Sequence, residues 1–112
     1  MSKDLKLALL VDLYGPLLTD KQQETLEMYY DSDLSLGEIS EETGITRQGV
    51  MNCVKKSEAR LIELEDRLGL AKRLAVLEAQ VDRLETIMRS ESPDGEISPA
   101  AKEQLTLIKN SL

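Results

Sequence analysis

The sequence predicts an all-α protein with a long C-terminal helical extension, and three observations support this fold class. Leu, Glu, Lys, Ala and Arg are abundant, while the alternation of apolar and polar residues that is typical of strands is missing. Phe, Trp and His are absent, so the core is expected to be aliphatic, with three tyrosines. Helix-capping signals also precede several apolar runs. The length of 112 residues suits one small domain with a helical extension.

The first helix is expected over residues 4–14. Asp4 favours the positive end of its dipole, and the Gly-Pro pair at 15–16 ends it. Leu17 and Leu18 follow this turn, and we expect both to pack in the core beneath it.

A second helix is expected over residues 20–31. Thr19 and Gln22 form the capping box that opens it. Tyr29 and Tyr30, near its end, are expected to pack against the following helices, with their hydroxyls reaching water.

Residues 35–61 predict two helices joined by a tight turn, which is the helix-turn-helix unit. Ser35 and Glu38 form a second capping box, opening a helix over residues 36–43. Gly44 supplies a residue that takes positive φ at a helix end, and a turn follows.

The second helix of the motif is expected over residues 46–68, with Thr46 as its N-cap and Gly69 as its first stop signal. One face should be buried, because apolar or small residues recur at steps of four, three and four: Val50, Val54, Ser57 and Leu61. The exposed face carries the predicted nucleic-acid-binding residues: Thr46, Arg47, Gln48, Met51, Asn52, Lys55, Lys56 and Arg60. Basic side chains suit phosphates or guanine edges, and amides suit adenine edges in a major groove. Lys56 and Arg60, farther along the helix, are expected to meet only the backbone of the nucleic acid.

A family resemblance rests on the segments LLTDKQ, MYYDSDLSLGEI and TRQGV, within a match over roughly residues 5 to 70. They are similar to region 4 of bacterial sigma factors, and they resemble the YlxM family even more closely. YlxM proteins are helix-turn-helix proteins of Gram-positive bacteria, and their genes typically lie beside genes of the signal recognition particle. The resemblance implies a helix-turn-helix domain of the winged-helix-like DNA-binding superfamily over residues 1–69. It also implies a role near that particle, with its RNA or its GTPase subunit as partner.

Residues 70–112 form the predicted extension. A stripe with spacings of 4, 3, 4, 3 and 4 is typical of a coiled-coil seam on a helix over 71–89: Leu70, Leu74, Leu77, Val81, Leu84 and Met88. Two interpretations stay open: the helix folds back at Gly69 onto its own domain, or the stripe forms a homodimer interface. The stripe is long for so small a domain to cover, which favours the dimer.

The end of the chain predicts a linker followed by a short helix. Residues 90–98 are rich in Ser, Pro, Gly and acid, so a mobile linker is expected. Ser98 and Pro99 are an N-cap and a first helical residue, opening a helix over 99–110. Leu105 and Ile108 are its expected docking side chains.

The charge is distributed unevenly along the chain. The net charge of −7 argues against a general polyanion binder. Residues 31–44 contribute −5, whereas residues 45–60 contribute +3, from four bases and one acid. The only basic segment is therefore the predicted recognition helix.

The sequence indicates no catalytic or metal-binding chemistry. The absence of His and the single Cys53 exclude a His-based triad and a zinc cluster, and no glycine loop has phosphate-binding spacing. We therefore expect a non-enzyme without cofactor. One cysteine fits a reducing cytoplasm, and no apolar run has the length of a membrane span or a signal peptide.

Three functions agree with these observations. The resemblance favours an accessory protein of the signal recognition particle pathway. The helix-turn-helix and its basic helix favour a sequence-specific DNA-binding regulator. The net charge of −7 favours a protein-interaction module that has kept the fold and no longer binds nucleic acid.

Overall fold

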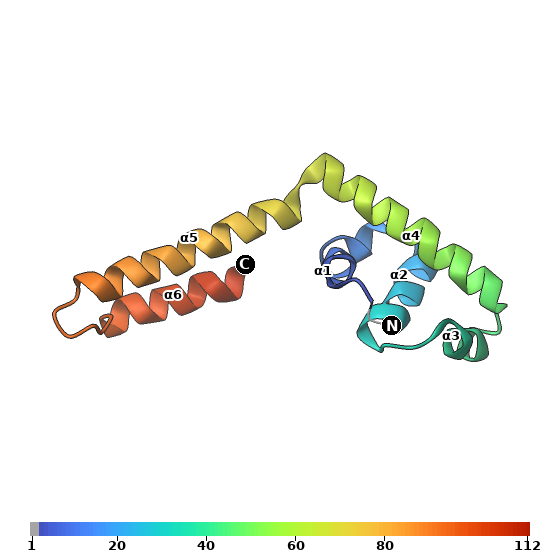
Figure 1. The fold of residues 1–112 in the computed structure, drawn as a ribbon, viewed down its shortest axis with the longest axis horizontal. Helices are drawn as coiled ribbons and strands as arrows, with labels where there is room; N and C mark the ends of the chain where they lie inside the picture. Colours follow the sequence, from blue (N-terminus) through green and yellow to red (C-terminus); the bar gives the residue numbers. More distant parts are fainter. Residues whose placement is uncertain (1–2) are drawn as a thin grey trace. The chain divides into compact units, whose positions relative to one another are not determined.

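A computed structural model describes residues 3–112, and every regular element within that range is helical, as predicted (Figure 1). The chain divides into two compact units. The first ends at Ala71, and the second is Lys72–Leu112.

The first unit is built around one long helix. Its α-helices are α1 (Leu5–Tyr14), α2 (Asp20–Leu26), α3 (Leu36–Thr43) and α4 (Arg47–Leu68), and α1, α2 and α3 all pack against α4. Figure 1 shows α4 in green beside these three shorter helices. The bounds predicted for α1, α3 and α4 agree with the structure to within one residue.

The predicted capping residues begin these helices. Four N-cap side chains accept a hydrogen bond from a backbone N–H of the first turn: Asp4, Thr19, Ser35 and Thr46. At Thr19 and Ser35 the box is complete, because Gln22 and Glu38 accept the backbone N–H of the cap residue in return. Gly44 ends α3 with a φ of 75°, a left-handed backbone conformation that residues with a side chain rarely adopt.

The core of this unit is aliphatic and includes one buried tyrosine, Tyr14. Its buried residues are Leu10, Val11, Tyr14, Leu18, Leu26, Ile39, Val50, Val54, Leu61 and Leu64. The predicted inner face of α4 is confirmed, and it continues one turn further to Leu64. Ser57 is also fully buried, and its hydroxyl donates to the Cys53 carbonyl at 2.6 Å.

Two expectations about the connection between α1 and α2 have different outcomes. Leu18 is buried as predicted, but Leu17 is 58% exposed, so its placement in the core was wrong. Leu17 is the last residue of a 3-10 turn, Gly15–Leu17, and Leu18 follows it with an extended backbone, so only the Leu18 side chain points into the core.

The helix predicted over residues 20–31 does not remain α-helical. After Leu26 it widens into a π-helical turn, Glu27–Asp31, in which the Ser32 N–H donates to the Glu27 carbonyl at 3.1 Å. Tyr30 lies in this turn. We had expected its hydroxyl to reach water, but the hydroxyl donates to the Glu58 carboxylate on α4.

Tyr14 closes the end of the first unit. Its hydroxyl donates to the Glu65 carboxylate at 2.6 Å and accepts the Leu70 N–H at 3.1 Å. The same Glu65 oxygen accepts the Ala71 N–H at 3.0 Å. These groups cap the helix that starts at Leu70, since its first N–H groups have no partner inside the helix. Burial, followed by the hydrogen bond to Glu65, raises the pKa of Tyr14.

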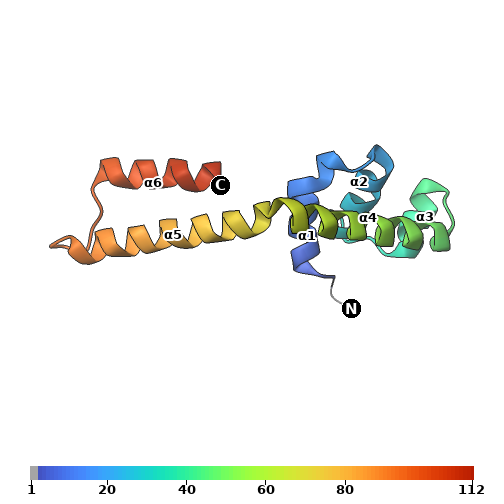
Figure 2. The same ribbon diagram turned by 90° about the horizontal axis from the view of Figure 1, so that it is seen from above.

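The second unit is a helical hairpin. It contains most of α5 (Leu70–Glu91) together with α6 (Pro99–Ser111), and these lie side by side and antiparallel in both ribbon views (Figures 1 and 2). Segment 90–98, expected to be a mobile linker, begins with the end of α5 and continues as a hydrogen-bonded turn. In that turn the Asp94 carboxylate accepts from the Ser92 hydroxyl at 2.7 Å and from the Glu96 N–H at 2.9 Å.

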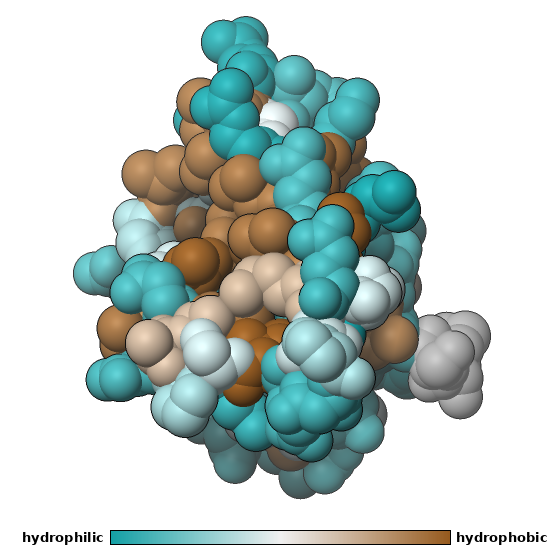
Figure 3. All heavy atoms as spheres, turned by 90° about the vertical axis from the view of Figure 1, so that its left-hand side faces the viewer, coloured by the Kyte–Doolittle hydropathy of each residue, from teal (hydrophilic) through white to brown (hydrophobic). Residues whose placement is uncertain are grey.

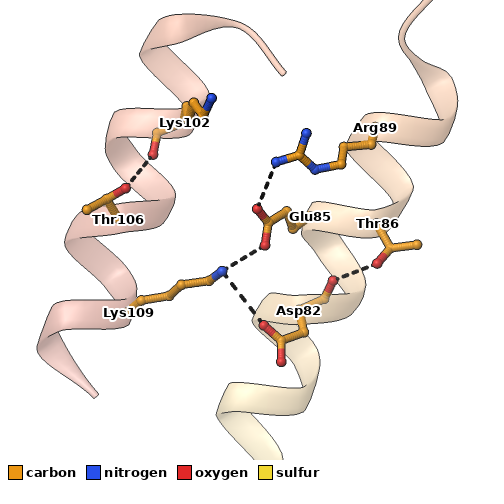
Figure 4. Close-up of polar contacts among 7 residues, drawn as sticks. All are labelled: Asp82, Glu85, Thr86, Arg89, Lys102, Thr106 and Lys109. Atoms are coloured by element: carbon orange, nitrogen blue, oxygen red, sulfur yellow. Dashed lines mark hydrogen bonds and ion pairs between the residues drawn. The ribbon is translucent and has the colours of Figure 1, made fainter. Parts of the chain in front are cut away.

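Polar and apolar contacts both hold α6 against α5. Lys109 reaches Glu85 at 2.7 Å and Asp82 at 3.9 Å (Figure 4). The ammonium group, with Arg89, lowers the pKa of Glu85. Leu105 is buried, as predicted for a docking side chain, and Ile97 is buried beside the turn.

Truncation of the core should destabilise the first unit strongly. Leu61 is fully buried, so Leu61→Ala should lower the free energy of unfolding by about 2–5 kcal/mol. Leu17→Ala is the matched control at an exposed site and should change it by less than about 0.5 kcal/mol. Chemical denaturation followed by circular dichroism measures both. Equal effects of the two variants would contradict the assignment of the core.

The Tyr14 hydroxyl should stabilise the fold in a pH-dependent way. Tyr14→Phe should cost about 1–3 kcal/mol at neutral pH, because the Leu70 N–H loses its acceptor. Since the pKa is raised in the folded state, the folded chain holds this proton above the ordinary titration range of tyrosine, near 10. Unfolding is then favoured as pH rises, so the difference between wild type and variant should shrink above about pH 10. Parallel stability curves from neutral to alkaline pH would rule out this contribution.

Candidate nucleic-acid interface

The turn before α4 sets the position of the helix-turn-helix. The Ser40 hydroxyl donates to the Ile45 carbonyl at 2.5 Å, which holds the turn against α3. A Cβ at Gly49 would lie only 2.8 Å from Ile45 Cγ2. The glycine therefore lets Ile45 pack closely against the first turn of α4.

All of the predicted binding residues reach the surface of α4. Met51 is half-buried, and the others are exposed. Thr46 has a structural role, since its hydroxyl accepts the Gly49 N–H at 3.1 Å and caps the helix. Apart from Arg60, the remaining residues lie in three places on the helix.

The first place is the outward ridge of α4, where two amides are paired. The Gln48 side-chain NH₂ donates to the Asn52 side-chain oxygen at 3.2 Å and lies 3.9 Å from the Met51 sulfur. This pair leaves the Gln48 carbonyl oxygen and the Asn52 NH₂ for a ligand. Together they form one acceptor and one donor on neighbouring turns of the helix.

The second place is a cleft that joins α4 to the start of α2. Its lining residues are Thr19, Lys21, Gln22, Asn52, Cys53, Lys55 and Lys56. Three lysines thus border one concave surface, beside the amide pair. Sequence reasoning missed Lys21, although it lies in the LLTDKQ segment, because only the packing of α2 on α4 brings it to the recognition helix.

The third place, which holds Arg47, is on the other flank. This side chain lines a separate cleft with Lys3, Tyr29, Tyr30 and Glu58 among its neighbours. Lys3 donates to the Leu34 carbonyl at 2.7 Å and lies 3.8 Å from the centre of the Tyr29 ring. Arg47 therefore does not lie in the same cleft as Lys21, Lys55 and Lys56.

Three other charges near the motif have partners. Arg60, predicted to meet the nucleic-acid backbone, forms an ion pair with Glu63 at 3.1 Å. Glu38, one of the acids expected to repel phosphate, accepts the Ser35 N–H in the capping box, and this hydrogen bond lowers its pKa. The Asp33 carboxylate pairs with Lys3 at 3.3 Å.

The predicted dimer stripe is split by exposure. Leu74, Val81 and Met88 are half-buried, and Val81 lines a cleft with Lys109 of α6 and with Leu112, the residue after this helix. Leu70, Leu77 and Leu84 are 42%, 40% and 48% exposed.

Residues 3–112 contain no group of three or more His, Cys, Asp and Glu side chains that could hold a metal ion. None of the helices in this described range is both long and apolar enough to cross a membrane.

Comparison with known proteins identifies relatives over most of the chain. The family model UPF0122, described as "Putative helix-turn-helix protein, YlxM / p13 like", matches residues 1–98. A UPF0122 protein of Thermoanaerobacter sp. (strain X514) is 47% identical over 94 residues, covering 81% of this chain and 80% of the relative. Those of Desulforamulus reducens and Limosilactobacillus reuteri are 40% and 38% identical over 94 residues, covering 80% and 84% of this chain and 80% and 83% of the relatives.

Proposed function

The chain belongs to the UPF0122 family of YlxM / p13-like helix-turn-helix proteins, and we propose that it is a non-catalytic regulatory protein that binds duplex DNA through α4. One observation carries this proposal: the lysine cleft lies directly beside the exposed amide pair of the recognition helix. Cationic groups and base-reading groups are the two components that such an interface needs.

The amide pair is the candidate for base recognition. An adenine in the major groove offers the N7 acceptor and the N6 amino donor. The free NH₂ of Asn52 could donate to N7, and the free carbonyl oxygen of Gln48 could accept from the N6 amino group. Their mutual hydrogen bond also orients both side chains before a ligand arrives, which reduces the entropy lost on binding.

The lysine cleft is the candidate for backbone contact. Lys55 and Lys56 extend from α4, and Lys21 extends from α2, so they can approach the phosphates of a backbone that runs along this one cleft. In helix-turn-helix proteins the recognition helix enters the groove while a preceding helix crosses the backbone. Three phosphate contacts imply a salt slope of about −3 on duplex DNA. Binding is therefore modest, and a dimer or a protein partner supplies further affinity.

A role in the signal recognition particle pathway is the second candidate, and family membership favours it. Genes of the YlxM family typically lie beside genes of the particle, so the particle RNA and its GTPase subunit are the candidate partners, in the cytoplasm. A-form RNA presents a major groove too narrow for side chains to read. RNA binding would therefore use the lysines and not the amide pair. A third candidate, a module that binds only protein, is favoured by the net charge of −7.

Two double variants separate these candidates. Lys55→Ala/Lys56→Ala should weaken binding to both duplex DNA and the particle RNA by roughly tenfold or more. Gln48→Ala/Asn52→Ala should reduce discrimination among DNA sequences by about 1–3 kcal/mol and leave RNA affinity unchanged. Fluorescence anisotropy with a randomised duplex pool, selected sequences and the particle RNA measures each.

The control for the lysine variant removes the same charge elsewhere. Arg67→Ala/Lys102→Ala changes two exposed bases outside the cleft and should bind as wild type does. If the wild-type chain binds neither nucleic acid, the proposal fails in favour of the protein-interaction module. If the lysine variant and the control variant lose affinity equally, the total charge of the chain sets the affinity, and the lysine cleft is not the binding site.

Lys21 provides a separate test of the cleft. Lys21→Ala should reduce the salt slope on duplex DNA by about one and weaken all sequences equally, because a phosphate contact carries no sequence information. Titrations at several salt concentrations measure the slope. An unchanged slope would place α2 outside the interface.

A further inference from the structure

We propose that the open face of α5 is an antiparallel interface with a second copy of this chain. The face is a stripe different from the seam that the sequence predicted. Its residues recur at spacings of 4, 3, 4, 3 and 4: Arg73, Leu77, Gln80, Leu84, Ile87 and Glu91. We call this set the second stripe.

The second stripe has no cover within its own unit. Leu77, Leu84 and Ile87 are 40%, 48% and 39% exposed, and Val76 at the margin is 50% exposed. The face of the molecule drawn in Figure 3 has hydrophobic residues, in brown, at the surface among hydrophilic ones in teal. Four large aliphatic side chains on one side of one helix are more than isolated surface residues, and they indicate an interaction site.

The neighbouring helix occupies a different side of α5. The cleft between α5 and α6 is lined by Glu78, Val81 and Asp82 of α5, by Lys109 of α6, and by Leu112 after its end. Figure 4 shows Lys109 reaching Glu85 and Asp82 on that side. Successive residues of a helix are rotated by about 100° around its axis. Glu78, Asp82 and Glu85 therefore lie on a different side of α5 from Gln80 and Ile87. α5 thus has one face for α6 and an adjacent face without a partner.

The order of charges along the second stripe identifies the occupant. A base, Arg73, stands at one end and an acid, Glu91, at the other, and the residues between them carry no charge. Two parallel copies would bring base against base and acid against acid. Two antiparallel copies would bring Arg73 of each copy against Glu91 of the other, at both ends of the interface.

Side-chain matching agrees with the antiparallel arrangement. Residues at equal distance from Asp82 face each other in this geometry: Arg73 with Glu91, Leu77 with Ile87, and Gln80 with Leu84. Every contact is repeated by the two-fold axis, as in an isologous dimer interface. With α6 of each copy on the adjacent face, two hairpins form a four-helix bundle. Three residues of the originally predicted seam, Leu77, Leu84 and Met88, lie in or beside this interface, whereas Val81 serves the contact with α6.

A charge exchange tests the direction of pairing. In sedimentation velocity on the full chain, the wild type should be a dimer in the micromolar range. Arg73→Glu and Glu91→Arg should each weaken dimerisation roughly tenfold or more, since both end pairs become repulsive. The combined variant should return to within about threefold of wild type, because attraction is restored with the signs reversed. Lys102→Glu, an exposed change of the same charge on α6, should leave the dimer unaffected.

Cross-linking gives an independent reading in a Cys53→Ser background. Chains with Leu77→Cys should form disulfides with chains that carry Ile87→Cys, and neither should cross-link with itself. Self-cross-linking of Leu77→Cys would overturn the antiparallel model, as would failure of the combined charge variant to recover. A wild-type chain that stays monomeric at high micromolar concentration would overturn the interface altogether. No nucleic acid is present in these measurements, so their failure is separate from a failure of DNA binding.

Discussion

The buried face of α4 is the constraint on which the first unit depends. Val50, Val54, Ser57 and Leu61 lie on it, and α1, α2 and α3 all pack against it. Each large aliphatic side chain buried there contributes about 1.5–3 kcal/mol, a considerable share of the stability of a small domain. The same constraint fixes the opposite side of the helix. Gln48, Asn52 and Lys55 face outward because the residues between them are held inward, so the core orients the candidate interface.

Local signals in the sequence were sufficient for most of the fold. The capping boxes at Thr19 and Ser35, the left-handed glycine at position 44 and the spacing of the inner α4 residues each act over three or four residues. The features that depend on distant packing could not be predicted in this way. The π-helical turn contains Tyr30, which is hydrogen-bonded to Glu58, 28 residues away, and Lys21 reaches α4 only because α2 packs against it. The separation of Arg47 from the lysines has the same origin.

Net charge describes this protein poorly. Its −7 would discourage contact with a polyanion if the charge were spread evenly. In the structure, several acids already have partners, such as Glu38 in a cap and Asp33 beside Lys3, whereas Lys21, Lys55 and Lys56 border one cleft. At physiological salt, exposed charges more than about 8 Å away are largely screened. The charges that border the cleft therefore decide how a phosphate is received, and the distant acids contribute little.

The two stripes of α5 show why a heptad pattern alone does not define an interface. Leu77 and Leu84 belong to both stripes, so the sequence admits either register, and the seam through Leu74 and Val81 has the more continuous run of apolar residues. In the structure one residue of that seam, Val81, lines the cleft between α5 and α6. What stays exposed is the stripe with charges only at its ends. In the dimer that we propose, α5 uses two adjacent faces, one for α6 and one for the second copy, and the shared leucines lie at the edge between them.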